Sequence, residues 1–141
     1  MKPTPRGVPD EDSTEAQLLG LNVLLVDDHD DSRDTIAEFL RFHGADVTAV
    51  PSVKAALAAH AASTFDALVS DIRMPDATGY DLIRAVRQGP PEKAGIRAIA
   101  ITAYAEREGR EESLGAGFDE YMPKMSSVRL VRALVSLCPR A

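Results

Sequence analysis

Residues 23–28 read VLLVDD, four apolar side chains followed by two aspartates. A continuous apolar run of this kind is typical of a parallel strand that is covered on both faces. Similar runs follow near residues 46–50, 66–70, 97–101 and 120–122, and stretches with helical spacing separate them. The sequence therefore predicts five units, each a strand followed by a helix.

The intervening helices have recognisable start and stop signals. Helices are predicted over residues 32–42, 106–116 and 127–137, with one more after Ser52 and one after Gly79. Ser52 is a suitable N-cap because its hydroxyl can accept a hydrogen bond from the first helical turn. Gly109 lies inside the predicted 106–116 helix and should weaken it by about 1 kcal/mol relative to alanine.

Alternating strands and helices imply a parallel sheet with helices on both faces and right-handed crossovers. In such a sheet, ligands bind beyond the carboxyl ends of the strands, where the strand order reverses. With the order 2-1-3-4-5, the first and third strands are neighbours about 4.8 Å apart. The residues that directly follow each strand are therefore the first candidates for function.

Composition limits the remaining possibilities. A chain of 141 residues predicts one domain, and we expect residues 1–18, rich in proline and acids, to form a flexible tail or linker before a folded domain over 19–141. The net charge of −6 disfavours direct binding to nucleic acid, and no apolar run is long enough to span a membrane. A single cysteine, Cys138, and the lack of a secretory signal favour a cytoplasmic protein.

Polar residues follow four of the five predicted strands. Asp27 and Asp28 follow the first, Asp71 the third, Thr102 the fourth and Lys124 the fifth. Three converging carboxylates would repel one another, and a hard divalent cation relieves that repulsion. Mg²⁺ fits because it binds one or two carboxylates, water and a phosphate oxygen. The pattern thus indicates a magnesium site suited to phosphoryl chemistry.

An aspartate at such a site can itself accept a phosphoryl group as an acyl phosphate. A metal ion and a lysine then neutralise the charge on the transferring group. Lys124 is expected two strands from Asp71, about 10 Å away, a gap that its long side chain and the phosphorylated aspartate can close. Thr102 lies on the strand between them.

These residues together resemble the receiver domain of two-component response regulators. The resemblance covers about residues 21–138 and is carried by Val26-Asp27-Asp28, Asp71-Ile72-Arg73-Met74-Pro75 with Gly79, Ile101-Thr102-Ala103, and Tyr121 with Lys124. It implies the flavodoxin-like (βα)5 fold, an α/β three-layer sandwich with sheet order 2-1-3-4-5. It also implies a phosphorylation switch rather than an enzyme.

The resemblance assigns a role to each matched residue. Asp71 is the implied phosphoacceptor, and Mg²⁺ is held by Asp27, Asp28, Asp71 and the backbone carbonyl of Arg73. Thr102, Ala103 and Lys124 contact the phosphoryl group, and Thr102 and Tyr121 form the switch. The implied partners are a histidine kinase or phosphotransfer protein, which supplies phosphohistidine, and a downstream protein effector; a homodimer is left open.

The chain departs from the family pattern after Lys124. The family usually has a proline with a cis bond there, whereas this chain has Met125. A non-proline cis bond costs about 2.5–4 kcal/mol, so either a trans bond or a strained loop is expected. Arg73 adds a cation that either screens the phosphoryl group from water or points outward.

Two other functions compete with the switch. Asp28-His29-Asp30 resembles the first motif of haloacid-dehalogenase-type phosphatases, with Asp28 as nucleophile and Asp30 as acid and base. That alternative leaves Asp71 and Gly79 unexplained and lacks a later acidic motif. The other is an unphosphorylated docking module, which the complete acidic set disfavours. The three histidines, His29, His43 and His60, share no metal spacing and are interpreted as structural or surface residues.

Overall fold

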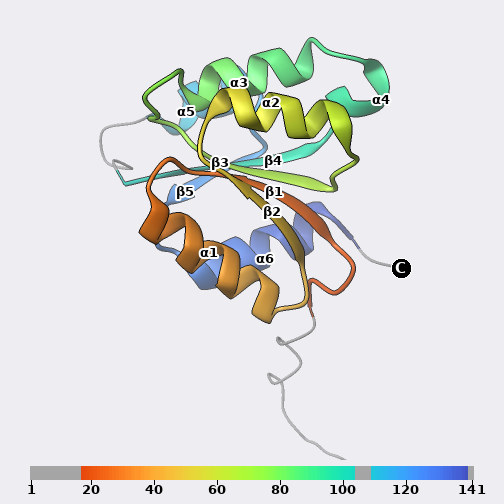
Figure 1. The fold of residues 1–141 in the computed structure, drawn as a ribbon, viewed down its shortest axis with the longest axis vertical. Helices are drawn as coiled ribbons and strands as arrows, with labels where there is room; N and C mark the ends of the chain where they lie inside the picture. The colour runs from red at the N-terminus through yellow and green to blue at the C-terminus, as the bar shows by residue number, and fades with distance from the viewer. Residues whose placement is uncertain (1–16, 104–108, 140–141) are drawn as a thin grey trace, which may run out of the picture.

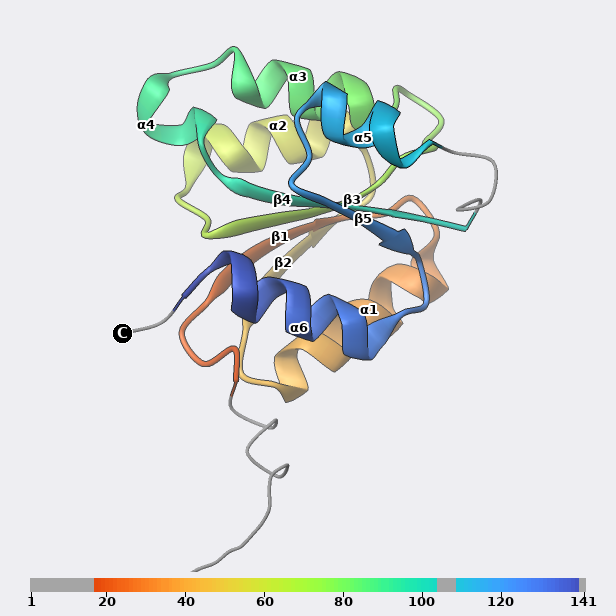
Figure 2. The ribbon, with the colours of Figure 1, turned by 180° about the vertical axis from the view of Figure 1, so that it is seen from behind.

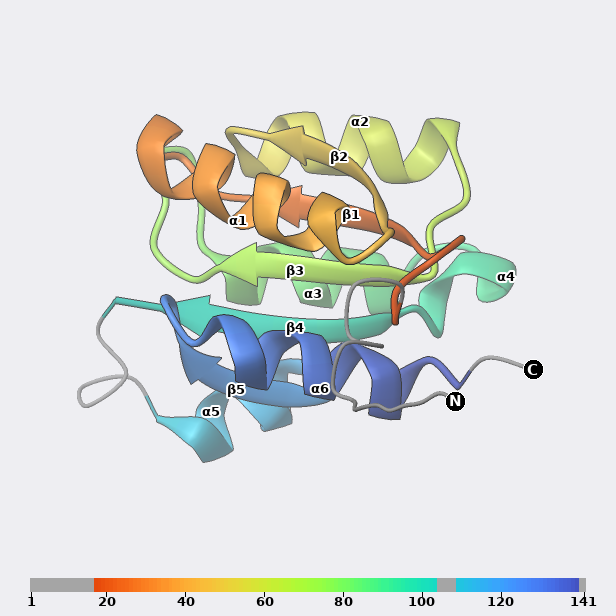
Figure 3. The same cartoon turned by 90° about the horizontal axis from the view of Figure 1, so that it is seen from below.

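The computed structural model describes residues 17–103 and 109–139. Five parallel strands form one sheet in the order β2-β1-β3-β4-β5, as predicted (Figures 1 and 3). The strands are β1 (Asn22–Val26), β2 (Asp46–Val50), β3 (Ala67–Asp71), β4 (Arg97–Thr102) and β5 (Glu120–Pro123). The flavodoxin-like fold is thereby confirmed.

Helices cover both faces of the sheet. They are α1 (Asp30–Phe42), α2 (Val53–Ala62), α3 (Gly79–Arg87), α4 (Pro91–Ala94), α5 (Arg110–Ala116) and α6 (Ser127–Leu137). Figures 1 and 2 show α1 and α6 on one face and α2, α3 and α5 on the other. Each face has its own apolar cluster, and every residue of β3 is buried between them. A strand covered on both faces explains its continuous apolar sequence.

The folded core begins one residue before the expected boundary at residue 19. Leu18 is 1% exposed and packs in the cluster under α1 and α6. Its backbone N–H donates to the carbonyl of His43 at 2.8 Å. Gly44, with φ of +101°, permits this contact because a Cβ there would lie 2.8 Å from the Leu19 nitrogen. Residues 1–16 lie outside the described part of the chain.

Several predicted helix boundaries need correction. Gly109 is the N-cap of α5 rather than an interior residue, so α5 begins at Arg110; residues 106–108 of the predicted helix lie outside the described residues. Helix α1 begins two residues before Ser32, and the short α4 was not predicted. The Ser52 prediction is confirmed, since its side chain accepts from the Ala55 N–H at 3.0 Å.

Candidate functional site

The parallel register brings the strand ends to one edge of the sheet. Because β1 pairs with β3, β3 with β4 and β4 with β5, Asp27, Asp71, Thr102 and Lys124 all emerge at the same carboxyl edge. The Lys124 N–H donates to the carbonyl of Thr102 at 2.9 Å, which fixes the start of the loop after β5. The expected convergence of these residues is therefore present.

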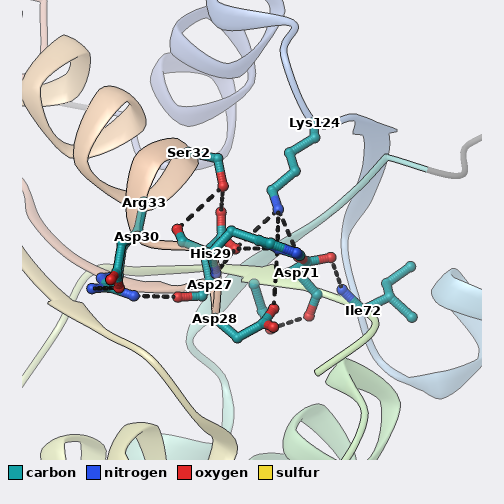
Figure 4. A network of polar contacts seen from close by, with 10 residues as sticks. Asp27, Asp28, His29, Asp30, Ser32, Arg33, Asp71, Ile72 and Lys124 are labelled. Carbon is teal, nitrogen blue, oxygen red and sulfur yellow. Dashed lines mark hydrogen bonds and ion pairs between the residues drawn. The ribbon is translucent and has the colours of Figure 1, made fainter. Parts of the chain in front are cut away.

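Lys124 lies between two carboxylates (Figure 4). Its Nζ donates to Asp71 Oδ2 at 2.8 Å and to Asp27 Oδ1 at 2.9 Å, and only 8% of its side chain is exposed. Burial lowers the pKa of Lys124, but hydrogen bonds and charge attraction from Asp71 and Asp27 outweigh it, so the net pKa is raised. The lysine therefore stays charged and reaches the aspartate directly.

Asp27 is fully buried but held as an anion. Its carboxylate accepts hydrogen bonds from Ser32 Oγ at 2.5 Å and from the His29 N–H at 3.0 Å, as well as from Lys124. Burial raises the pKa of Asp27, yet these donors more than compensate and leave the pKa below its ordinary value. Arg33 donates to the Asp27 carbonyl at 2.9 Å, which ties α1 to the end of β1.

Asp71 behaves differently from Asp27. Burial is the largest influence and raises the pKa of Asp71, even though Lys124 and the Ile72 N–H, at 2.7 Å, both donate to its carboxylate. The nearby charge of Asp27 adds to the increase. The anionic form of Asp71 is thus incompletely compensated by the protein alone.

A close contact behind Asp71 explains Gly79. Its N–H donates to the carbonyl of Ile72 at 2.7 Å, and a Cβ on Gly79 would lie 2.6 Å from the Asp71 carbonyl oxygen. Only glycine fits this approach. The start of α3 is therefore held against the loop that follows the candidate acceptor.

Asp28 completes an acidic cluster. Ligand atoms of Asp27, Asp28, Asp71 and His29 all lie within 4.8 Å of one another. Asp28 Oδ1 is buried and has no hydrogen-bond partner among the described residues. Oxygen-rich clusters with one orphaned carboxylate oxygen suit a hard cation such as Mg²⁺. The residues present therefore fit the predicted magnesium site.

The predicted phosphoryl-contacting residues line one open cleft of about 980 Å³. Asp71, Thr102, Ala103, Lys124 and Arg73 all reach it. Arg73 has an exposed side chain; its backbone carbonyl stays a predicted metal ligand.

Tyr121 is not one of the residues that line this cleft. It is 6% exposed and packs in the apolar cluster beneath α3 and α5, so its switching role stays a prediction.

The structure also tests the predictions for the Lys124–Met125 bond and for Asp30. No peptide bond within the described residues is cis, so the Lys124–Met125 bond is the trans form, one of the two expected outcomes. Asp30 is 82% exposed and pairs with Arg33 at 2.6 Å, outside the acidic cluster. It lines the cleft but is not among the clustered ligand atoms with Asp28, which disfavours the phosphatase alternative that pairs these two carboxylates.

Sequence reasoning missed some contacts at this edge. His29 was interpreted as a structural or surface residue; it is exposed, yet its ring belongs to the acidic cluster. Ser32 is predicted only as the start of a helix, yet its hydroxyl, in the first turn of α1, donates to Asp27 Oδ2 at 2.5 Å. The carboxylate of Asp76 accepts from the N–H groups of Val53 and Lys54 and caps α2 from another loop. No local sequence pattern predicts the contact between Asp76 and the start of α2.

Comparison with known proteins decides the family. The chain matches the response regulator receiver domain over residues 23–136. The chain belongs to the receiver domain family. Receiver domains are regulatory phosphoacceptor domains of two-component systems rather than classical enzymes, and the acidic pocket of this one is compatible with Mg²⁺ and phosphorylation.

Curated relatives differ in how much of their length this chain spans. An uncharacterised 14.6 kDa protein of Leptolyngbya boryana is 38% identical over 86% of this chain and 92% of its own length. Sensor histidine kinase GacS of Pseudomonas protegens is 32% identical over 94% of this chain, which spans 15% of the kinase. The chain spans less than half the length of several other curated relatives.

A solved receiver domain shows the same likeness in three dimensions. The receiver domain of sensor histidine kinase PA1611 from Pseudomonas aeruginosa has a TM-score of 0.78 and 30% identity, covering 86% of this chain and 99% of that one. It was solved with a magnesium ion coordinated in its active site cleft. Within the described part of this receiver domain, no helix is long and apolar enough to cross a membrane.

Proposed function

We propose that this receiver domain is a switch that accepts a phosphoryl group on Asp71 from the phosphohistidine of a histidine kinase or phosphotransfer protein. The observation that carries the proposal is the contact of one buried lysine, Lys124, with both Asp71 and Asp27. Lys124 and Asp71 line an open cleft. A carboxylate with a raised pKa, accessible from the cleft and paired with a fixed ammonium, is suited to accept phosphorus.

In the proposed transfer, an Asp71 carboxylate oxygen attacks the phosphorus in line with the leaving nitrogen. The O–P bond forms as the N–P bond breaks, and the donor imidazole keeps the electron pair and regains a proton. Lys124 donates to an oxygen of the phosphoryl group, while the Ile72 N–H keeps the other Asp71 oxygen in place. This chain assists the transfer by positioning and charge alone.

Asp27, Asp28, Asp71 and the backbone carbonyl of Arg73 would hold the magnesium ion. When bound, Mg²⁺ supplies positive charge beside the equatorial phosphoryl oxygens. Asp27 contributes as an anion whose position is set by Ser32 and the His29 N–H. Hydrolysis of the acyl phosphate by water, aided by the same residues, would return Asp71 to the carboxylate.

Phosphorylation would change the partner-binding surface through Thr102 and Tyr121. The added phosphoryl group carries about −1.5 to −2 charge and biases a two-state equilibrium toward the form in which Thr102 donates to it. Thr102 and Ala103 line the cleft, and Tyr121 is packed on the next strand. We propose that a downstream protein effector recognises the resulting change, and that the exchange occurs in the cytoplasm, where the Cys138 thiol stays reduced.

The test is phosphate incorporation from a radiolabelled phosphorylated histidine kinase. Wild type should acquire an alkali-labile label that chelation of divalent cations prevents, and Asp71→Asn should acquire none. Asp31→Asn is the matched control, since Asp31 lines the same cleft but stands outside the acidic cluster. Undiminished labelling of Asp71→Asn would overturn the proposal.

A docking module that is never phosphorylated predicts another result. Effector capture would then be equal with and without the beryllofluoride mimic of the phosphoryl group, and Asp71→Asn would leave it unchanged. The switch predicts capture that increases with the mimic in wild type and does not increase in Asp71→Asn.

A further inference from the structure

The position of His29 brings a ring nitrogen beside the carboxylates. His29 is the N-cap of α1, with φ of −88° and ψ of 119°, and makes no side-chain cap. Its N–H is bonded to Asp27 Oδ1, which fixes the backbone at this point. The imidazole Nδ1 then lies 3.4 Å from Asp28 Oδ1 and 3.7 Å from Asp27 Oδ1 (Figure 4).

A cation also lies close to this ring nitrogen of His29. Lys124 Nζ lies 3.5 Å from His29 Nδ1, and an ammonium group can only donate. With the ring proton on Nε2, the Nδ1 atom presents its lone pair, which is the form of imidazole that binds metals. Because the same nitrogen lies within 3.7 Å of two carboxylate oxygens, one metal ion could contact all three groups.

We propose that His29 adds a nitrogen ligand to the cluster of Asp27, Asp28 and Asp71, so that this site prefers divalent transition metals over Mg²⁺. The inference rests on the metal role in the proposed function. Imidazole suits the first-row transition metals, whereas Mg²⁺ takes oxygen ligands. Ligand atoms about 2.1 Å from one ion lie at most about 4.2 Å apart, so a cluster within 4.8 Å needs only small side-chain movements.

His29 also has the freedom to make this adjustment. Its side chain is 68% exposed at the edge of the cleft, in contrast to the fully buried Asp27. Asp28 Oδ1 is buried without a hydrogen-bond partner in the described structure and faces the same nitrogen. A shared cation would satisfy both groups without moving the backbone.

Calorimetric titration of Ni²⁺ and Mg²⁺ into the full chain tests the proposal. Changing His29→Asn should weaken Ni²⁺ binding about tenfold or more. It should change Mg²⁺ binding by less than about twofold, because Mg²⁺ relies on the carboxylates. Asp31→Asn is the control for local charge and should weaken both ions slightly and equally. The double variant Asp28→Asn with Asp71→Asn keeps all three histidines and measures Ni²⁺ bound elsewhere.

Bound Mn²⁺ provides a spectroscopic readout that a merely structural His29 would not change. Electron spin echo modulation should show a coupled ¹⁴N nucleus in wild type and none in His29→Asn. Absence of ¹⁴N coupling in wild type, or equal loss of Ni²⁺ and Mg²⁺ affinity in His29→Asn, overturns the proposal. An imidazolium that only screens the carboxylates would instead make both ions bind more tightly after the substitution.

The Mn²⁺ measurement separates failure of this inference from failure of the proposed function. Mn²⁺ that binds wild type without ¹⁴N coupling removes His29 from the ligand set and leaves the magnesium-dependent switch intact. Mn²⁺ that fails to bind wild type at all removes the metal role of Asp28 and Asp71, and with it both proposals.

Discussion

At the amino ends of the strands, cationic side chains bind backbone carbonyls, whereas at the carboxyl ends one cation faces a group of carboxylates. Arg87 donates to the carbonyl oxygens of Ala94, Ile96 and Gly117, and pairs with Asp119. Lys93 donates to three carbonyls at the end of α2: His60, Ala61 and Ser63. Lys124 instead lies between Asp27 and Asp71, with Asp28 nearby.

This difference separates stability from function within one sheet. Carbonyls at helix ends carry partial charges that one cation satisfies, so Arg87 and Lys93 should mainly stabilise the fold. Three carboxylates exceed what Lys124 alone can neutralise, and the raised pKa of Asp71 reflects that excess after burial. The carboxyl edge should therefore gain stability from a bound cation, whereas the amino edge should not.

The largest expected effect is at the amino edge. Arg87→Ala leaves three partly buried carbonyls without their donor and should lower the free energy of unfolding by about 2–4 kcal/mol. Urea denaturation measures the change. Arg84→Ala, an exposed position on the same helix, is the matched control and should change it by less than about 0.5 kcal/mol. Equal losses in both variants would contradict the anchoring role of Arg87.

The next largest loss of stability is expected at the carboxyl edge of the sheet, where Gly79 packs against the loop after β3. Gly79→Ala places a Cβ 2.6 Å from the Asp71 carbonyl oxygen and should cost about 2 kcal/mol while slowing phosphorylation. Gly95→Ala is its control, because a Cβ there meets nothing within 4 Å. Thermal unfolding and labelling rates measure both. A Gly79→Ala protein as stable as Gly95→Ala would show that the loop has room to shift.

A smaller, pH-dependent effect distinguishes two carboxylates of one site. Because the pKa of Asp27 is lowered in the folded state, its contribution to stability is present above the unfolded value near 3.8 and is lost as pH falls through the folded pKa. Because the pKa of Asp71 is raised, stability falls as pH rises from the unfolded value near 3.8 to the folded pKa; this penalty is complete above the folded pKa and absent below 3.8.

The two asparagine variants should therefore diverge as pH rises. Without divalent cations, Asp27→Asn should become less stable than wild type, and Asp71→Asn more stable, with both differences vanishing in acid. Urea denaturation over a pH series measures them. If both variants shifted stability in one direction, the opposite environments assigned to these carboxylates would be wrong.

The smallest effect concerns Lys93. Lys93→Ala removes a cation from the carbonyl end of α2 and should lower the free energy of unfolding by about 0.5–1 kcal/mol. Lys54→Ala, at the opposite end of α2, is the control and should leave stability nearly unchanged. Raising the salt concentration should reduce the Lys93 effect. A loss for Lys54→Ala as large as for Lys93→Ala would remove the capping explanation.

The sequence predicted the sheet edge better than the contacts around it. The apolar runs of β1, β3 and β4 end in Asp27, Asp71 and Thr102, and parallel pairing alone brings such residues together. The direct contact of Lys124 with Asp27 was not predicted, because side-chain reach depends on the loop after β5. The family resemblance, rather than spacing, gave the roles of Arg73 and Tyr121.

Contacts between distant loops were beyond local reasoning. Arg87 donates to Gly117, thirty residues away, and nothing near either residue indicates the partner. The position of Gly109 within the helix was predicted wrongly, because glycine occurs both inside weak helices and at N-caps and the sequence alone does not distinguish the two. Gly79 was recognised as part of a motif, but the reason for it, a 2.6 Å approach to the Asp71 carbonyl, depends on the packing of α3.

The most direct test of the central claim locates the phosphorylated residue. Phosphorylated protein is treated with borohydride, which reduces an aspartyl phosphate to homoserine and releases phosphate, and peptides are sequenced by mass spectrometry. The account predicts homoserine at position 71, dependent on a divalent cation and absent without phosphodonor. Homoserine at position 27 or 28, or label retained on another side chain with Asp71 intact, would contradict it.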